Sequence, residues 1–122
     1  MDAINANESF AALAQETRLK AFRLLVQNEP DGLPAGEIAR RLQVPHNTLS
    51  AHLSVLLQAG LVMSRRQSRS IIYRARLSHM REIIQFLIHD CCSGHPDVCE
   101  PMPGLEAPAN DCNKTTSRGV KI

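Results

Sequence analysis

A change of hydrophobic period near the middle of the chain is the feature that most restricts how this sequence can fold. Apolar side chains recur at helical spacing over residues 35–42 and again over residues 46–59, where three leucines share one face. Gly60 then stands where a left-handed helix cap is expected, and a period of two follows over residues 61–66 and 71–75. The pattern predicts two short helices joined by a tight turn and followed directly by a β-hairpin.

The length and composition fit a single small domain. Of the 122 residues, 43% are hydrophobic and only 3% aromatic, which supports one core and argues against a two-domain enzyme with a deep substrate cleft. The longest stretch without a formal charge, residues 42–64, is too polar to span a bilayer. Residues 1–20 lack the basic start and apolar run of a signal peptide, so we expect a cytoplasmic protein with no membrane partner.

Three further helices are expected, at residues 4–14, 16–28 and 78–92. The last of them carries a wide apolar stripe made of Met80, Ile83, Ile84, Leu87, Ile88 and Cys91. A stripe this wide on a terminal helix needs covering from more than one side. We interpret it as a surface that pairs two copies of the chain, with ordinary core packing as the alternative.

The C-terminal part of the chain differs in composition from the rest. Four prolines from Ser93 onward predict an absence of regular structure, and the tail beyond about residue 103 is expected to be disordered. The expected organisation is therefore a folded domain at 4–92, followed by a loop and tail at 93–122. The last third also holds all four cysteines, Cys91, Cys92, Cys99 and Cys112. In a reducing cytosol such clustering favours metal binding or redox chemistry over a disulfide scaffold.

The positive charge of the chain is concentrated in its middle. The net charge is only +2, yet between Gly36 and Arg76 seven arginines stand against one acid, Glu37, a balance of +6. A basic segment favours an anionic partner, and nucleic acid is the commonest one for a small domain. Charge alone does not separate this interpretation from a solvated charged face.

Two short helices with a tight turn and a basic hairpin predict a winged helix-turn-helix, so the fold class is mainly α with a small β-hairpin. A helix with its side chains is about 10–12 Å across, which matches the ~12 Å major groove of DNA. Short polar groups on the second helix can reach base edges or phosphates, and arginines of the hairpin can lie along the backbone. The predicted DNA-binding residues are His46, Asn47, Thr48, Ser50, Ala51 and Ser54 on the helix and Arg65, Arg66 and Arg69 in the hairpin. The alternatives are that His46 and Asn47 only cap the helix and that His52 is a packed interior residue.

Several stretches of residues 10–77 resemble the ArsR/SmtB family of winged-helix metalloregulatory repressors. They are Phe10-Ala11-Ala12-Leu13-Ala14, Thr17-Arg18-Leu19, Gly36-Glu37-Ile38-Ala39, Thr48-Leu49-Ser50-Ala51-His52-Leu53 and Leu57-Gln58-Ala59-Gly60-Leu61-Val62. The resemblance implies a cytoplasmic homodimer, paired through its first and last helices, that binds a double-stranded operator with two half-sites and is released by an inducer. Three residues depart from the family pattern: Pro34 stands for a capping Ser or Thr, Gln43 for a turn Gly, and Ala51 for a frequent His.

The resemblance also bears on the inducer. Many arsenic-sensing members carry cysteines in the first helix of the helix-turn-helix, and this sequence has none at 36–42. Cys91, Cys92 and Cys99 are instead similar to a branch of arsenical repressors with a C-terminal vicinal pair and a third cysteine. This implies that the three thiolates bind trivalent arsenic (arsenite or methylarsenite) or antimonite, with no organic cofactor. Thiolate softness agrees with that choice.

Two other sensory chemistries and one enzymatic one remain as alternatives. Zinc or cadmium would prefer a fourth ligand, which His89, His95 or Cys112 can supply, and the thiols can also respond to oxidation. A thiol enzyme is the third possibility, because Cys112 and Arg118 have the spacing of a phosphate-binding nucleophile loop. That chemistry needs a strand before the loop and a helix after it, and the tail has no strand signal, so we expect no enzymatic activity.

Overall fold

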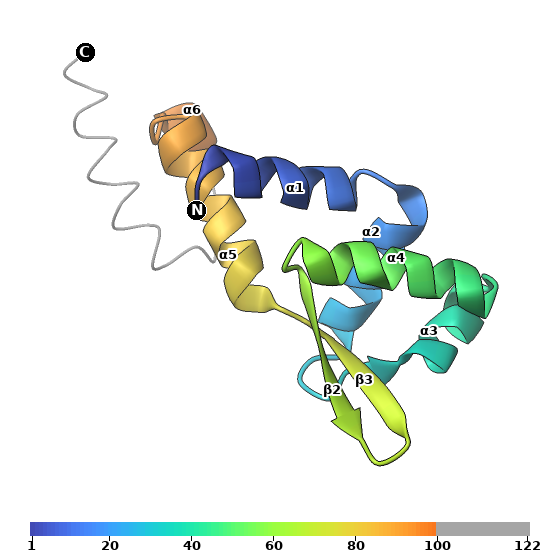
Figure 1. The fold of residues 1–122 in the computed structure, drawn as a ribbon. Helices are drawn as coiled ribbons and strands as arrows, with labels where there is room; N and C mark the ends of the chain where they lie inside the picture. The colour runs from blue at the N-terminus through green and yellow to red at the C-terminus, as the bar shows by residue number, and fades with distance from the viewer. Residues whose placement is uncertain (100–122) are drawn as a thin grey trace. The chain divides into compact units, whose positions relative to one another are not determined.

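The computed structural model describes residues 1–99 of the chain (Figure 1). Its elements are α1 (Ala3–Leu13), α2 (Glu16–Gln27), β1 (Leu33–Pro34), α3 (Ala35–Leu42), α4 (His46–Gln58), β2 (Val62–Gln67), β3 (Ser70–Ala75), α5 (Leu77–Gln85), a π-helix (Phe86–Cys91) and α6 (Pro96–Cys99). The chain divides into two compact units, one made of residues 2–80 and one that begins at Arg81 and includes Met1. Within the described residues, no helix is long and apolar enough to cross a lipid bilayer.

The helix-turn-helix and the hairpin lie where the sequence predicts them. Helix α4 ends in a left-handed turn at Gly60, whose φ is +81°, and the Leu61 N–H donates to the Leu56 carbonyl at 3.0 Å. The chain then runs directly into β2. Figure 1 shows the hairpin β2–β3, called the wing below, extending away from the helices. The fold is thus mostly helical with a small antiparallel sheet, as expected.

The sheet has a third strand that the sequence pattern does not reveal. Strand β1 pairs with β3 in an antiparallel register that places Leu33 opposite Tyr73, and the strand order is β1-β3-β2. Gly32 makes this approach possible, because a Cβ at this position would lie 2.5 Å from the Tyr73 carbonyl oxygen. A strand of two residues is too short to show a period of its own.

The core of residues 2–80 is built mainly from α2, α3, α4 and the start of β2. Its largest fully buried apolar side chains are Leu25, Ile38, Leu49, Leu53, Leu56, Leu61 and Val62. Helix α1 is fastened by polar contacts as well, since the buried Ser9 hydroxyl lies 2.9 Å from Nε2 of His79 at the start of α5. The Arg18 Nε donates to the Ala12 carbonyl at the end of α1 at 2.7 Å. The same guanidinium lies 3.4 Å from Nδ1 of His52 on α4.

The last predicted helix, at 78–92, needs correction in its geometry. It is α-helical only to Gln85 and continues to Cys91 with π-type bonding, in which the Cys92 N–H donates to the Leu87 carbonyl at 3.0 Å. The wider turn changes the phase of the apolar stripe, so that Ile88 is buried with Ile84 and Val98 packed against it, whereas Leu87 is 36% exposed. A search for apolar residues at 3.6 residues per turn does not detect the change from α-helix to π-helix.

The expectation of no regular structure after Ser93 is wrong over the described residues. Ser93 and Gly94 have positive φ values of 53° and 65° and reverse the chain, after which the short helix α6 begins at Pro96. A proline suits the first position of a helix because its missing N–H has no partner there anyway. Residues 100–122, including the tail for which we expected disorder, lie outside the described part of the chain.

Gly32→Ala should lower the free energy of unfolding by at least about 1 kcal/mol, because the added methyl group meets β3 and the left-handed φ of 76° disfavours a side chain. Gly36→Ala is the matched control. Its Cβ meets nothing within 4 Å and it lies inside α3, so this change should be neutral or stabilising by up to about 1 kcal/mol. Urea unfolding followed by circular dichroism measures both, and equal effects would contradict the prediction.

Candidate functional site

The outward face of α4 carries every helix residue predicted to contact DNA. His46, Asn47, Thr48, Ser50, Ala51 and Ser54 are all exposed, and the three leucines on the other side of the helix are at most 1% exposed. The helix starts after Pro45, whose ring supplies no side-chain cap. The Thr48 N–H donates to Oδ1 of Asn47 at 2.9 Å, a bond inside the first turn, and neither His46 nor Asn47 is the capping residue of the helix. His52 is partly buried and faces Arg18.

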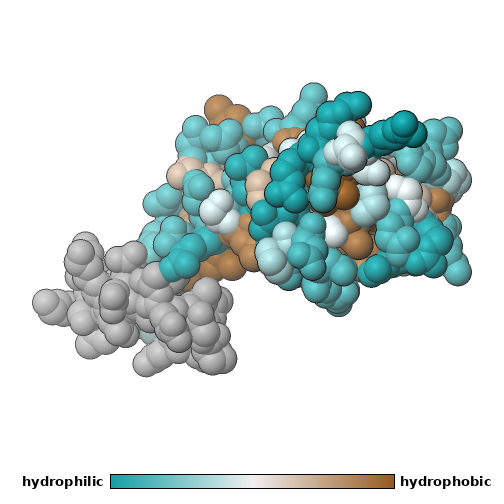
Figure 2. Space-filling view, turned by 90° about the horizontal axis from the view of Figure 1, so that it is seen from below, coloured by the Kyte–Doolittle hydropathy of each residue, from teal (hydrophilic) through white to brown (hydrophobic). Residues whose placement is uncertain are grey.

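The wing presents its arginines in different directions. Arg65, Arg66 and Arg69 are all exposed. In the register of β2 and β3, Arg65 pairs with Ile72 and Arg66 with Ile71, and successive residues of a strand point to opposite faces. Arg66 therefore shares the face on which Val62 and Ala75 are buried, while Arg65 lies on the other face. Figure 2 views the molecule from the side toward which the wing points, and the surface seen there is mostly hydrophilic.

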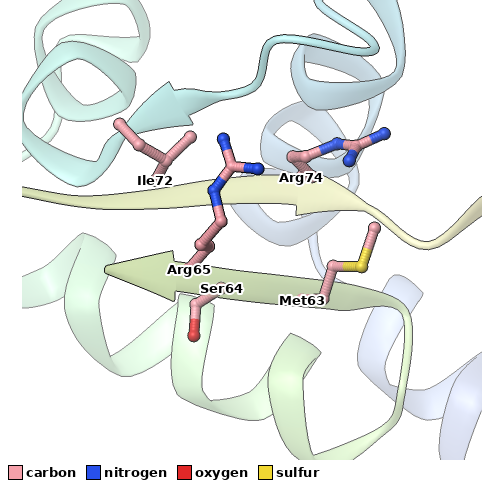
Figure 3. Close-up of a pocket in the computed structure, with 5 residues that line it drawn as sticks. All are labelled: Met63, Ser64, Arg65, Ile72 and Arg74. Atoms are coloured by element: carbon pink, nitrogen blue, oxygen red, sulfur yellow. The ribbon is translucent and has the colours of Figure 1, made fainter. Parts of the chain in front are cut away.

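The base of the wing is held by an ion pair that sequence analysis did not identify. Arg74 on β3 donates to both carboxylate oxygens of Glu29, from Nε at 3.1 Å and from Nη2 at 2.8 Å. This hydrogen bonding raises the pKa of Arg74 above its ordinary value. Figure 3 shows Arg65 reaching from β2 toward β3 beside Arg74, with Ser64 pointing the other way. A cavity of about 90 Å³ is lined by residues of the two strands, namely Met63, Ser64, Arg65, Ile72 and Arg74. Arg74 thus has a structural partner and is not only solvated.

Helix α3 carries a second group of charged side chains. Glu37 accepts hydrogen bonds from Arg40, with one Nε–Oε1 distance of 3.1 Å and a second, shorter contact, and from Nε of Arg41 at 2.7 Å. These bonds lower the pKa of the Glu37 carboxyl from 4.5 to about 2. The helix begins after Pro34 without a side-chain cap, as the departure from the family pattern predicts, and Gln43 ends it in the left-handed conformation with φ 58°.

The vicinal cysteines lie at the end of the π-helix. Both are free thiols, with Cys91 exposed and Cys92 half-buried. A hydrogen bond with Cys91, followed by burial and by the charge of Cys91, raises the pKa of Cys92 above the ordinary thiol value of 9.0. Cys99 belongs to α6, and its side chain lies outside the described part, as does Cys112. Among the side chains that are described, no three of His, Cys, Asp or Glu form a metal-binding group. His95 Nδ1 instead accepts from the Asp97 N–H at 3.1 Å.

These features define a winged helix-turn-helix protein, and the comparisons with known proteins agree. A family model described as a helix-turn-helix domain matches residues 13–65. The transcriptional activator HlyU of Vibrio cholerae is 31% identical over 84 residues, which are 69% of this chain and 75% of HlyU. The transcriptional repressor SdpR of Bacillus subtilis is 26% identical over 92 residues, 75% of this chain and 99% of SdpR.

Solved structures identify the family to which the chain belongs. An ArsR-like transcriptional regulator from Rhodococcus sp. RHA1 has a TM-score of 0.63 at 28% identity, with 81% of this chain and 96% of that one covered. A homodimeric winged helix-turn-helix DNA-binding domain from Mycobacterium bovis, a possible ArsR-family regulator, has a TM-score of 0.57 at 26% identity, covering 75% and 84%. The chain belongs to the ArsR family of winged-helix transcriptional regulators. These relatives are named as regulators of transcription.

The rate of alkylation by iodoacetamide should report the raised pKa of the Cys92 thiol. Because the thiolate is the nucleophile, a raised pKa lowers the fraction of Cys92 that reacts at neutral pH. The alkylation rate at Cys92 should therefore increase with pH, and the midpoint of that increase should lie at a higher pH in the folded protein than in the urea-unfolded chain. Cys91→Ala removes the largest cause of the shift and should move the midpoint down. Peptide mass spectrometry over a pH series measures both rates. A folded midpoint at or below the unfolded one would contradict this assignment.

Proposed function

We propose that this protein is a repressor that binds operator DNA as a homodimer and is released when Cys91, Cys92 and Cys99 bind trivalent arsenic or antimony. The observation that carries the inducer assignment is the pair of free, adjacent thiols at the end of a helix. Soft metalloid ions bind thiolates in preference to oxygen or nitrogen ligands.

The π-helix supports this use of the vicinal pair. Successive side chains of an α-helix diverge by about 100°, which holds two neighbouring sulfurs poorly around one ion. Here the π-helix ends at Cys91 and Cys92 leaves helical geometry, with φ −116° and ψ 8°, so helical spacing does not hold the two sulfurs apart. The turn at Ser93 and Gly94 brings the chain back into α6, to which Cys99 belongs. Three thiolates would also neutralise a trivalent centre, which allows the complex to sit beside apolar residues such as Ile88.

The DNA-binding part of the proposal rests on α4 and the wing. The polar face of α4 is exposed, and Pro45 supplies no side-chain cap to its first turn. The Thr48 N–H donates to Asn47, which leaves the backbone N–H groups of His46 and Asn47 to meet a phosphate. Arg65, Arg66 and Arg69 would follow the DNA backbone on either side of the wing. The roles of the individual residues are those predicted from the sequence.

A second copy of the chain would complete the operator-binding unit. Leu87 and Cys91 of the expected pairing stripe are exposed, and Ile4 on α1 is 73% exposed, so apolar surface is available on α1 and on the π-helix. In a dimer of this kind, recognition helices enter half-sites about 34–36 Å apart, and a small change in pairing misplaces one of them. A coupling of about 1–3 kcal/mol between inducer and DNA would lower the affinity about 5- to 150-fold.

Substitution of each sensor cysteine should separate induction from DNA binding. With a labelled duplex selected by the protein from a random pool, Cys91→Ser, Cys92→Ser and Cys99→Ser should leave the anisotropy titration unchanged without inducer. Each should abolish release by arsenite and antimonite. Cys112→Ser is the matched control, because the proposal does not use this thiol, and it should respond like the wild type.

The same titration tests the other sensory chemistries. Release by zinc or cadmium at lower concentrations than arsenite would overturn the metalloid assignment. So would release by peroxide, reversed by a thiol reductant, in a protein that does not respond to arsenite. Release by arsenite from the triple serine variant would overturn the role of the cysteines altogether.

Arg69→Ala and Asn47→Ala should weaken DNA binding in different ways. Loss of a phosphate contact from Arg69 should reduce affinity for all sequences alike and lower the slope of log K against log salt by about 0.9. Loss of a base contact from Asn47 should cost about 1–3 kcal/mol on the selected duplex and little on random DNA. Anisotropy at several salt concentrations measures both, and a sequence-independent effect of Asn47→Ala would remove it from the base-reading set.

A further inference from the structure

We propose that Arg40 and Arg41 of α3 form a second binding site for DNA phosphate, and that Glu37 occupies this site in the free protein as an internal competitor. The inference rests on the proposed DNA binding and adds to it. Neither arginine belongs to the DNA-binding set predicted from the sequence, which is confined to α4 and the wing.

The packing of α3 directs these charges outward. Ile38 and Ala39 are buried, at 0% and 5% exposure, and they fix the inner side of the helix. The side chains of Arg40 and Arg41 are 70% and 40% exposed, and that of Glu37 is 26% exposed. Because two guanidinium groups share one carboxylate, the group keeps a net positive charge while Glu37 stays ionised.

The connection to α4 places this group beside the proposed DNA surface. Only residues 43–45 separate the end of α3 from His46, the first residue of α4. The turn is compact, because the Val44 N–H donates to the Ala39 carbonyl at 3.1 Å and the Gln43 N–H to the Arg40 carbonyl at 3.3 Å. When α4 lies in the major groove, phosphates form the walls of that groove, and the first helix of a helix-turn-helix crosses the backbone. Arg40 and Arg41 are the cations on the first helix.

The contacts of Glu37 are those that a phosphate would make. Arginine binds carboxylate and phosphate through the same pairs of N–H groups, so one anion can replace the other. An exposed ion pair contributes little to stability, so exchanging the carboxylate for a phosphate removes little from the fold. Glu37 is free for this role because Pro34 has neither a hydroxyl nor a backbone N–H with which to form a capping box.

The test uses the full-length protein, random-sequence duplex DNA and the selected duplex. Glu37→Gln removes the competitor's charge and should steepen the slope of log K against log salt by up to about 0.9. Arg40→Ala and Arg41→Ala should each make the slope shallower by about the same amount, which is about a 3.5-fold change between 50 and 200 mM salt. The gain from Glu37→Gln should vanish when both arginines are alanine, which a purely structural role would not produce.

An ion pair of the same spacing provides the control. Glu16 and Lys20 on α2 lie 3.0 Å apart and are exposed, so Glu16→Gln and Lys20→Ala should leave the salt slope unchanged. Circular dichroism and thermal unfolding verify that every variant is folded. If the wild type shows a salt-dependent affinity that Arg40→Ala and Arg41→Ala do not alter, the inference fails and the proposed function stands. If the wild type binds neither duplex, the proposed function fails and this site with it.

Discussion

The burial of three leucines on one side of α4 is the constraint on which the rest of the structure depends. Leu49, Leu53 and Leu56 are at most 1% exposed, and burying a leucine side chain contributes about 1.5–3 kcal/mol. Side chains three or four positions apart share a helix face, so this burial also determines which residues point outward. The polar surface of α4 is therefore positioned by residues that never meet a ligand.

Periodicity could predict the parts of the fold in which a local pattern and the tertiary packing agree. The helices α3 and α4, the cap at Gly60 and the wing follow from residues close together in sequence. Strand β1 could not be predicted in this way, because its two residues become a strand only through pairing with β3 and the close approach of Gly32. The change to π-helix at Phe86 depends on backbone hydrogen bonds that no side-chain pattern records.

The candidate site shows the same division. The spacing of residues along the sequence predicts the exposed face of α4 and the exposed arginines of the wing. It also predicts that the vicinal cysteine pair lies at the end of a helix. That Arg65 and Arg66 point to opposite faces follows from the alternation of side chains along a strand. Which of them shares the buried face is known only once the strands are paired. The partner of Arg74 is Glu29, 45 residues away in the sequence, and no local pattern connects them.

The positive charge counted along the sequence is consequently not the charge that a polyanion meets. Of the seven arginines between Gly36 and Arg76, Arg74 is held by Glu29, and Arg40 and Arg41 share Glu37. A carboxylate that binds an arginine lowers its attraction for phosphate at every DNA sequence alike, whereas the base contacts proposed for α4 would act only at matching ones. Acids placed beside arginines thus weaken specific and non-specific binding by the same factor, and the ratio between the two is left to the base contacts. For a small regulator among many competing genomic sites, that ratio determines occupancy more than the total charge does.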